Sequence, residues 1–585
     1  MFRLTLVTCF LFIAWGAAVN VNWYKNIIVY QIYPRSFKDS NGDGIGDLKG
    51  ITSKLEHIAD IGAKALWLSP IYTSPQVDFG YDIANFTDID PSYGTLADFD
   101  RLVAKARKLK LKVILDFVPN HSSHEHPWFK KSIQRVKPYD QYYVWRDAKI
   151  VNGKRQPPNN WLSNFGGSAW EWSDVRKQYY LHQFAAGQPD LNYRSKALDQ
   201  ISYCIINLRF QIKEMKNVFT FWMDRGVDGF RVDAINFMFE DANFRDEPDS
   251  NRTDVPKDDY DSLNHIYTVD QNDTYDVVSS WRKLMDEHSN RTKSDPRLIL
   301  TEAYTNHDNT IKYYNAGSNV PFNFMFINKL NNESTAEDFK ELIENWVKTV
   351  PKGSVPNWVV GNHDNHRVGS RFGVQRAQQI VQLSMVLPGI SVVYNGDEIG
   401  MVDRNFTYAE TVDPAGCNAG PSRYFLKSRD PERTPYQWNN STSAGFSTSP
   451  KTWLPVHPNY QTLNLEAEKK VYYSPYWQFK TAASVKRQPV IARGSLKVNV
   501  YDQKLLTITR TLGKDVVVSL FNFANEPVTV NAGTLSSNLV VHTVTGDSEF
   551  RRGTFVSTDS LTIPKSSSVM FTTPNLLWSM DEEDV

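Results

Sequence analysis

The sequence of 585 residues predicts a (β/α)8 barrel with a small domain inserted after the third strand and an antiparallel β-sandwich domain near the C-terminus. Eight short apolar runs recur, and stretches with helical spacing lie between several of them. A long irregular segment separates the third run from the fourth, and after about residue 490 the pattern changes to short alternating strands. An open, doubly wound sheet would show a similar alternation, so the count of eight favours the barrel without excluding that sheet.

The eight apolar runs are the expected barrel strands. Each is short and contains apolar residues without a helical period, which is consistent with buried strands. They span residues 27–33, 63–70, 111–118, 226–234, 297–304, 321–327, 357–364 and 389–398. Between them, residues 97–110 and 335–350 repeat apolar side chains with helical period. Parallel strands need such crossover segments, so the runs and the helical stretches support one another.

The two ends of the chain carry different signals. Residues 1–18 hold Arg3, then an apolar run, then small residues, which predicts a cleaved secretory signal peptide and an extracellular protein. The run is short for a membrane span, no later segment is apolar enough to span, and the acidic C-terminus shows no lipid-anchor signal. The expected organisation is a signal peptide (1–18), a barrel in two parts (19–120 and 193–490), an inserted domain (121–192), a C-terminal β domain (491–575) and a tail (576–585).

Composition narrows the possible partners. The formal net charge is +0 and no basic block occurs, so binding to nucleic acid has no electrostatic basis. The 16 Trp and 28 Tyr suit either packing or stacking on sugar rings, and composition alone favours packing. Cys9 would be removed with the signal peptide. Cys204 and Cys417 would then either form one disulfide or remain as two free thiols. Glycosylation sequons between Asn85 and Asn440 are typical of a secreted glycoprotein, and nothing in the sequence sets the oligomeric state.

A loop with the spacing of a calcium site follows the first strand. The expected ligands at positions one, three, five, seven and nine are Asp39, Asn41, Asp43, the carbonyl of Ile45, and Asp47. Gly44 takes the sharp-turn position six, but position twelve is Gly50 where a bidentate Glu is usual. The loop therefore predicts a Ca²⁺ or Mg²⁺ site of modest affinity, with a metal-free Asn/Gly turn as the alternative.

Acidic residues stand at the ends of four expected strands. Asp116, Asp233, Glu302 and Asp364 close the third, fourth, fifth and seventh runs, where the chemistry of a barrel is located. Arg231 precedes Asp233 by two residues, so their side chains share one face of the strand. Any single Asp at a strand end could cap the next helix. Four such acids together favour a catalytic centre.

Carboxylates on two sides of one bond suit the cleavage of glycosides. The oxocarbenium-like transition state needs a carboxylate at the anomeric carbon and a protonated acid at the leaving oxygen. Phosphate chemistry would need a glycine-rich or lysine-containing loop, and none follows these strands. A zinc hydrolase would need histidines at ligand spacing, and His121, His124 and His126 are a weak match. The sequence predicts no organic cofactor.

Five short segments resemble one enzyme family. The segments DFVPNH, GFRVDA, TEAY and VVGNHD, at residues 116–121, 229–234, 301–304 and 359–364, resemble the four signature segments of the α-amylase superfamily, glycoside hydrolase family thirteen. QPDLN (188–192) resembles a fifth segment of its oligo-1,6-glucosidase branch, and the arrangement is most similar to the insect maltases, which are α-glucosidases. The resemblance covers about residues 20–575, and the segments are specific only in combination.

The resemblance implies a role for each site residue. Asp233 is expected to be the nucleophile, Glu302 the general acid/base and Asp364 the third carboxylate, which holds sugar hydroxyls. Arg231 would keep Asp233 ionised, because a nearby cation favours the charged form. The expected sugar contacts are His121 and His363, together with Asp78, Tyr81 and Arg433 around a terminal glucose. The loop metal would be structural.

A blind pocket would make the enzyme exo-acting. The implied activity is retaining hydrolysis of terminal α-1,4-linked glucose in maltose, sucrose and short oligosaccharides. The rivals are an endo-acting amylase with an open cleft, and a non-catalytic receptor or transporter heavy chain that lacks part of the triad or carries a membrane span.

The residue that follows Asp233 bears on linkage preference. In the branch that the sequence resembles, a small residue or Thr after the nucleophile accompanies α-1,4 cleavage and Val accompanies α-1,6 cleavage. Ala234 therefore favours α-1,4 cleavage, whereas QPDLN favours α-1,6 cleavage.

The segment near residues 197–211, which contains Cys204, is longer than the corresponding segment of the family that the sequence resembles. It is either a lengthened helix on the barrel wall or an artefact of the gene model that could impair folding.

Overall fold

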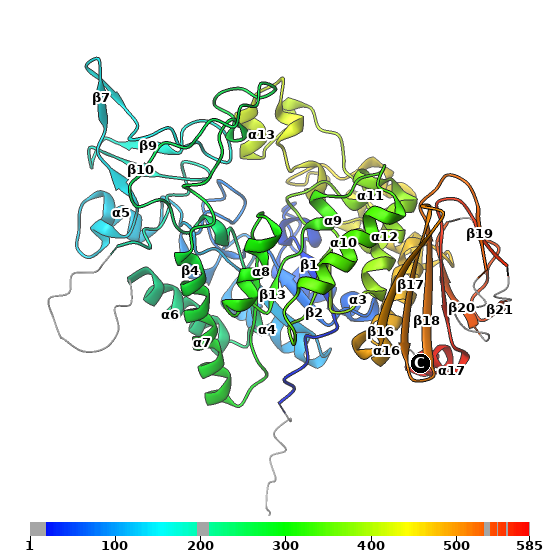
Figure 1. The fold of residues 1–585 in the computed structure, drawn as a ribbon. Helices are drawn as coiled ribbons and strands as arrows, with labels where there is room; N and C mark the ends of the chain where they lie inside the picture. Colours follow the sequence, from blue (N-terminus) through cyan, green and yellow to red (C-terminus); the bar gives the residue numbers. More distant parts are fainter. Residues whose placement is uncertain (1–18, 196–209, 532–538, 547, 557–559, 584–585) are drawn as a thin grey trace, which may run out of the picture.

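The computed structural model describes residues 19–195, 210–531, 539–546, 548–556 and 560–583 (Figure 1). The predicted signal peptide and most of the additional segment near 197–211, with Cys204, lie outside these ranges, while Cys417 is exposed. In the described part of the chain, no helix has both the length and the apolar character needed to cross a bilayer.

Eight parallel strands form a nearly closed barrel, as predicted. Their order around the barrel is β13-β12-β11-β5-β2-β1-β15-β14, and every hydrogen-bonded pair is parallel. The strands are β1 (Ile28–Ile32), β2 (Ala65–Leu68), β5 (Lys112–Phe117), β11 (Gly229–Val232), β12 (Leu298–Thr301), β13 (Val320–Pro321), β14 (Asn357–Val359) and β15 (Ile390–Tyr394). All carboxyl ends of these strands therefore meet at one mouth.

A side chain closes the barrel where two strands do not pair. β13 and β14 stand at the ends of the strand order, and Asn357 on β14 bridges them. Its amide nitrogen donates to Pro321 O at 2.6 Å, and its Oδ1 accepts from Asn323 N at 2.8 Å. The prediction of a strand over residues 321–327 is wrong after Pro321, because β13 ends there. The Asn323 side chain accepts from Met325 N at 3.1 Å, which turns the chain into helix α9 (Met325–Asn328).

Helices surround the barrel (Figure 1). The two that the sequence predicted are α4 (Leu96–Lys108) and α10 (Ala336–Thr349), and each begins at a Thr-x-x-Asp capping box. In both boxes the Thr hydroxyl and the Asp carboxylate satisfy N–H groups that the first turn leaves free. Further helices are α6 (Phe210–Asp224), α7 (Asp273–Thr292), α8 (His307–Asn315), α12 (Val374–Val386) and α15 (Pro475–Lys486).

The segment inserted after β5 forms a small subdomain that projects beyond the barrel in Figure 1. Its core is an antiparallel sheet of β6 (Trp145–Arg146), β10 (Gln178–Leu181) and β9 (Trp170–Ser173), with a hairpin of β7 (Lys149–Val151) and β8 (Lys154–Gln156) and helix α5 (Pro127–Ile133). Its last residues return to the barrel, where Asp190 bridges His121 and Leu191 N donates to Asn120 O at 2.9 Å. The subdomain therefore supplies side chains to the barrel mouth.

The C-terminal domain is antiparallel, as predicted. One sheet has the order β16-β17-β18-β23-β20-β21, and a separate pair is formed by β19 and β22. The strands are β16 (Ser495–Tyr501), β17 (Leu505–Leu512), β18 (Asp515–Asn522), β19 (Val528–Val530), β20 (Leu539–Val544), β21 (Phe555–Val556), β22 (Leu561–Ile563) and β23 (Ser568–Thr572). The expected tail is part of helix α17 (Pro574–Glu583), which buries Leu576 and Met580. The domain packs on the barrel through stacked Phe339 and Phe523.

Candidate active site

The four predicted acids meet at the barrel mouth. Asp116 lies on β5, Asp233 and Glu302 directly follow β11 and β12, and Asp364 follows β14. Asp116, Asp233 and Glu302 are buried. Four separate strand ends bring these acids together, which a set of unrelated helix caps would not do.

One guanidinium holds three of these carboxylates. The Nη1 atom of Arg231 donates to Asp116 Oδ1 at 2.9 Å and to Asp233 Oδ1 at 2.5 Å. Its Nη2 atom lies 3.4 Å from Glu302 Oε1. Arg231 is fully buried, so these contacts act in a medium that screens charge weakly. The arginine therefore fixes Asp233 and Glu302 relative to one another.

Glu302 is also held by the backbone beside Asp233. Ala234 N donates to Glu302 Oε2 at 2.7 Å. Ala234 has φ 45° and ψ 36°, the left-handed region, which turns the chain sharply after β11. This turn directs the N–H of Ala234 at Glu302 and leaves its methyl at the cavity wall. The expectation that Ala234 borders the reacting groups is consistent with this placement.

The two central carboxylates titrate as a coupled pair. Burial raises the pKa of Asp233 well above its ordinary value and also raises the pKa of Glu302, and Arg231 opposes the rise in each case. Each acid also accepts a hydrogen bond that favours its ionised form, from Arg231 at 2.5 Å for Asp233 and from Ala234 N at 2.7 Å for Glu302. The pair therefore combines one strongly held anion with a group that can keep a proton.

Asp364 has the opposite electrostatic environment. Arg433 Nη2 lies 2.8 Å and Arg429 Nη1 lies 3.4 Å from its Oδ1 atom, and His363 Nε2 is 3.4 Å from its Oδ2 atom. Burial alone would raise the pKa of Asp364, but His363, Arg433 and Arg429 bring that pKa below its ordinary value. Asp364 is therefore a fixed anion, suited to accept sugar hydroxyls.

These groups border a cavity of about 490 Å³. Six predicted site residues line it: Asp78, Tyr81, His121, Asp233, Glu302 and Asp364. Three others lie behind its wall and are fully buried: Arg231, His363 and Arg433. His363 stacks on Tyr81 and exchanges a 2.6 Å hydrogen bond with its hydroxyl. His363 and Arg433 contact cavity residues, Tyr81 and Asp364 respectively, and their contact with the sugar stays a prediction.

The arginine in the cavity wall is Arg429, which sequence reasoning missed. Its Nη2 atom donates to Asp78 Oδ1 at 2.8 Å, and Asp413 holds the same guanidinium at 2.5 Å. Gln188 also lines the cavity and donates to Asp78 Oδ2 at 3.1 Å. Gln188 opens the segment QPDLN, and Arg429 opens the segment RDPERTPYQW (429–438), which also contains the predicted Arg433. The second segment holds two arginines four residues apart, and sequence alone does not show which one faces the cavity.

The predicted metal loop is a hydrogen-bonded turn. Asp39 accepts backbone N–H groups of Asn41, Gly42 and Gly44, and Asp47 caps helix α2 (Leu48–Ser53) through Gly50 N at 2.7 Å. The Asp, Asn and carbonyl donors of this loop are hard oxygens, as Ca²⁺ and Mg²⁺ prefer. The loop lies outside the catalytic cavity, so no step of the reaction passes through it.

A buried acid pair and a third carboxylate at the mouth of a (β/α)8 barrel define a glycoside hydrolase. Residues 31–494 match the family model described as "Alpha amylase, catalytic domain". The chain belongs to the alpha-amylase family.

Relatives agree with this assignment over most of their length. The chain is 48% identical over 506 residues to "Alpha-glucosidase" of Apis mellifera, which covers 86% of each chain. It is 47% identical over 514 residues to "Maltase 1" of Drosophila virilis, covering 86% of this chain and 79% of that one. The solved structure of an "alpha-glucosyl transfer enzyme, XgtA" is 32% identical, with a TM-score of 0.81, over 94% of this chain and 99% of that chain.

Proposed function

We propose that the protein is a secreted, exo-acting, retaining α-glucosidase that hydrolyses terminal α-1,4-linked glucose in maltose, sucrose and short oligosaccharides. One observation carries the proposal: a single cavity joins the catalytic acids to an Asp78–Arg429 pair at hydrogen-bond distance. The relatives named alpha-glucosidase and maltase support it. The leader-like residues 1–18 support secretion.

The proposed mechanism gives the negative charge to Asp233, which Arg231 hydrogen-bonds at 2.5 Å, and the proton to Glu302. The Asp233 carboxylate attacks the anomeric carbon while Glu302 gives its proton to the leaving glycosidic oxygen, so that a glucosyl ester forms on Asp233. Glu302, now ionised, takes a proton from water, and the resulting hydroxide equivalent attacks the same carbon and releases Asp233. Two displacements restore the α configuration. Asp364 would hold hydroxyls of the same sugar as charge develops.

Exo action follows from the arginine side of the cavity. Asp78 is buried, and Arg429 is fixed by both Asp78 and Asp413. An ion pair held from two sides is a rigid wall that can offer both donors and acceptors to the hydroxyls of a terminal glucose. A chain that continued past that glucose would have to displace this pair.

A substrate panel tests the proposal. Purified protein should release glucose from maltose and sucrose, and glucose and maltohexaose should be the first products from maltoheptaose. An endo-acting enzyme would instead give mixed oligosaccharides from maltoheptaose at early times. If none of these sugars is cleaved by folded protein, the chain is a non-catalytic family member.

Linkage preference should depend on Ala234. Ala234→Val is expected to lower kcat/KM for maltose more than for isomaltose, by about 1–3 kcal/mol of discrimination, because branching at Cβ narrows the site for the leaving sugar. Valine is also strained at φ 45°, so melting temperatures must be measured alongside the kinetics.

Ala234→Ser is the matched control, since it adds one atom without branching at Cβ and should keep the preference for maltose. A wild type that already cleaves isomaltose faster than maltose would contradict this interpretation of Ala234.

The loop 39–47 is proposed to bind Ca²⁺ or Mg²⁺ in a structural role. Asp39→Ala with Asp43→Ala should lower the melting temperature while maltose hydrolysis persists below it. Asp39 also accepts from the Ser447 hydroxyl at 2.5 Å, so this variant loses hydrogen bonds whether or not a metal binds. The decisive comparison is therefore chelation, which should lower the melting temperature of wild type by a few degrees and leave that of the variant unchanged. Equal metal content before and after mutation would show that the loop is only a turn.

A further inference from the structure

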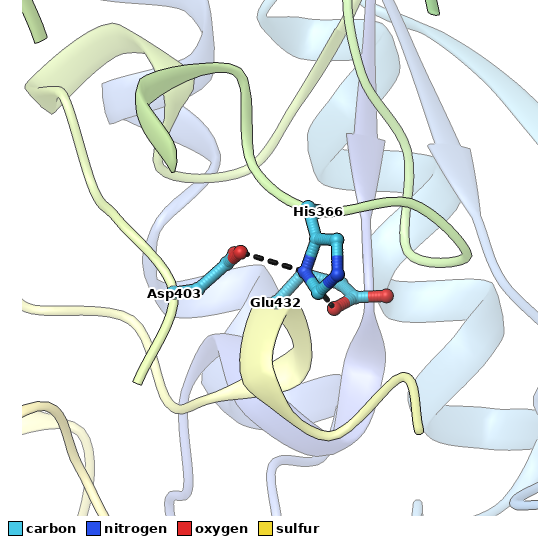
Figure 2. A group of neighbouring side chains, drawn as sticks. All are labelled: His366, Asp403 and Glu432. Atoms are coloured by element: carbon cyan, nitrogen blue, oxygen red, sulfur yellow. Dashed lines mark ion pairs between the residues drawn. The ribbon is translucent and has the colours of Figure 1, made fainter. Parts of the chain in front are cut away.

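We propose that His366, Asp403 and Glu432 form a second metal site, specific for a divalent transition metal such as zinc. None of the three lines the catalytic cavity, and none belongs to the loop 39–47. The inference does not depend on the proposed activity. Figure 2 shows the imidazole of His366 between the two carboxylates.

The three side chains come from separate parts of the chain and converge. His366 follows β14, Asp403 follows the turn η4 (Asp397–Ile399), and Glu432 lies in the turn η7 (Pro431–Arg433). One ligand atom from each lies within 4.8 Å of the other two. His366 Nδ1 is 2.8 Å from Asp403 Oδ2 and 3.7 Å from Glu432 Oε2. Tetrahedral zinc keeps its ligand atoms about 3.4 Å apart, so small side-chain movements suffice.

Glu432 supplies an independent reason to expect a cation. Its side chain is 2% exposed, and its Oε2 atom, which faces the cluster, has no hydrogen-bond partner among the described residues. Burying a carboxylate without partners is costly. Burial raises the pKa of Glu432 well above its ordinary value, and the nearby charge of Asp403 adds to that rise. A dication between Asp403 and Glu432 would relieve both effects.

The ligand set and its exposure favour zinc over calcium. One imidazole nitrogen with two carboxylate oxygens suits zinc and similar metals, whereas calcium prefers oxygen ligands alone. The His366 side chain is 52% exposed, so an ion can enter from solvent and keep water as its fourth ligand. The competing explanation is a protonated His366 that simply pairs with both acids.

A metal here would tie together two segments that support the catalytic centre. His366 follows Asp364 by two residues, and Glu432 precedes Arg433, whose Nη2 atom lies 2.8 Å from Asp364 Oδ1. Asp403 Oδ1 accepts from Arg367 N at 2.8 Å, which already fixes one ligand. Zinc binding should therefore raise the melting temperature, because a metal that binds only the folded state stabilises it.

Zinc uptake by chelator-treated full-length protein tests the site. Equilibrium dialysis with elemental analysis should show one zinc per chain, with an affinity that falls about tenfold or more in both His366→Ala and Glu432→Gln. Cobalt in place of zinc should give visible absorption bands that disappear in His366→Ala. His124→Ala, which removes another exposed histidine, should bind zinc as wild type does. Asp39→Ala with Asp43→Ala should do the same, which separates this site from the loop.

Two results would overturn the proposal. Failure of wild type to take up zinc would assign the cluster to a protonated ion pair. Zinc uptake that is equal in wild type, His366→Ala and Glu432→Gln would show adventitious binding elsewhere. Circular dichroism of each variant establishes that it is folded. Glu432→Gln keeps the size and shape of the buried side chain, so it still tests the site if His366→Ala perturbs the segment around residue 366.

Discussion

Asp233→Asn is expected to lower kcat for maltose by about 10⁴-fold or more, since it replaces the carboxylate nucleophile of the proposed covalent intermediate with a weakly nucleophilic amide. The fold should survive, because Arg231 keeps both hydrogen bonds to Asp116 and its charge stays compensated. Steady-state kinetics together with the melting temperature measure the two effects separately.

Asp116→Asn is the matched control for this prediction. Asp116 accepts from the same guanidinium but does not line the cavity, so its loss should act mainly on stability and less on kcat. If both variants show the same decrease in kcat and have the same melting temperature, the effect of Asp233 comes only from its ion pair with Arg231. Asp233 would then not be the nucleophile.

Glu302→Gln should have the second largest effect, with a size that depends on the leaving group. Maltose needs a proton at the departing oxygen, so its kcat should fall by about 10²–10⁴-fold. For α-glucosyl fluoride, whose leaving group needs little protonation, kcat/KM should fall much less than for maltose, because kcat/KM reports the first displacement. The kcat for the fluoride falls as well, since Glu302 also activates water in the second displacement. An equal loss of kcat/KM for both substrates would remove Glu302 from the role of general acid.

The pH profile gives a second readout for Glu302. Burial raises the pKa of Glu302, so its protonated form persists to higher pH than in an exposed Glu. Hydrolysis of maltose needs that form and should decline as the pH rises through this pKa. The corresponding limb of the profile should be absent when Glu302→Gln acts on α-glucosyl fluoride.

Much of the fold was predictable because buried parallel strands leave a clear apolar signal. Seven of the eight expected runs contain the strand that the structure shows, and both expected helices begin at capping boxes that are visible in the sequence. The prediction of a strand over residues 321–327 failed because Phe and Met pack equally well in a strand or a helix. One side chain, Asn323, determines where the strand ends. The closure of the barrel by Asn357 depends on contacts between distant residues, and no local pattern carries it.

Some residues of the candidate site could be predicted from the sequence and others could not. The acids Asp233, Glu302 and Asp364 were recognisable because strand ends fix their direction. Arg429 precedes the short 3-10 helix η7 and Arg433 ends it, so no repeating pattern in the sequence indicates which of them faces the cavity. The sugar contact of His363 stays a prediction, and in the structure its ring nitrogens contact Gln31 and Tyr81.

Retention of configuration is the central claim, and proton NMR of the first-formed sugar tests it most directly. The substrate should be 4-nitrophenyl α-glucoside, which releases a single glucose, at an enzyme concentration that outpaces mutarotation. A double displacement through Asp233 predicts that the α-anomer of glucose appears first and the β-anomer only later. Initial release of β-glucose would contradict the account, because it requires direct attack by water and leaves Asp233 without a covalent role.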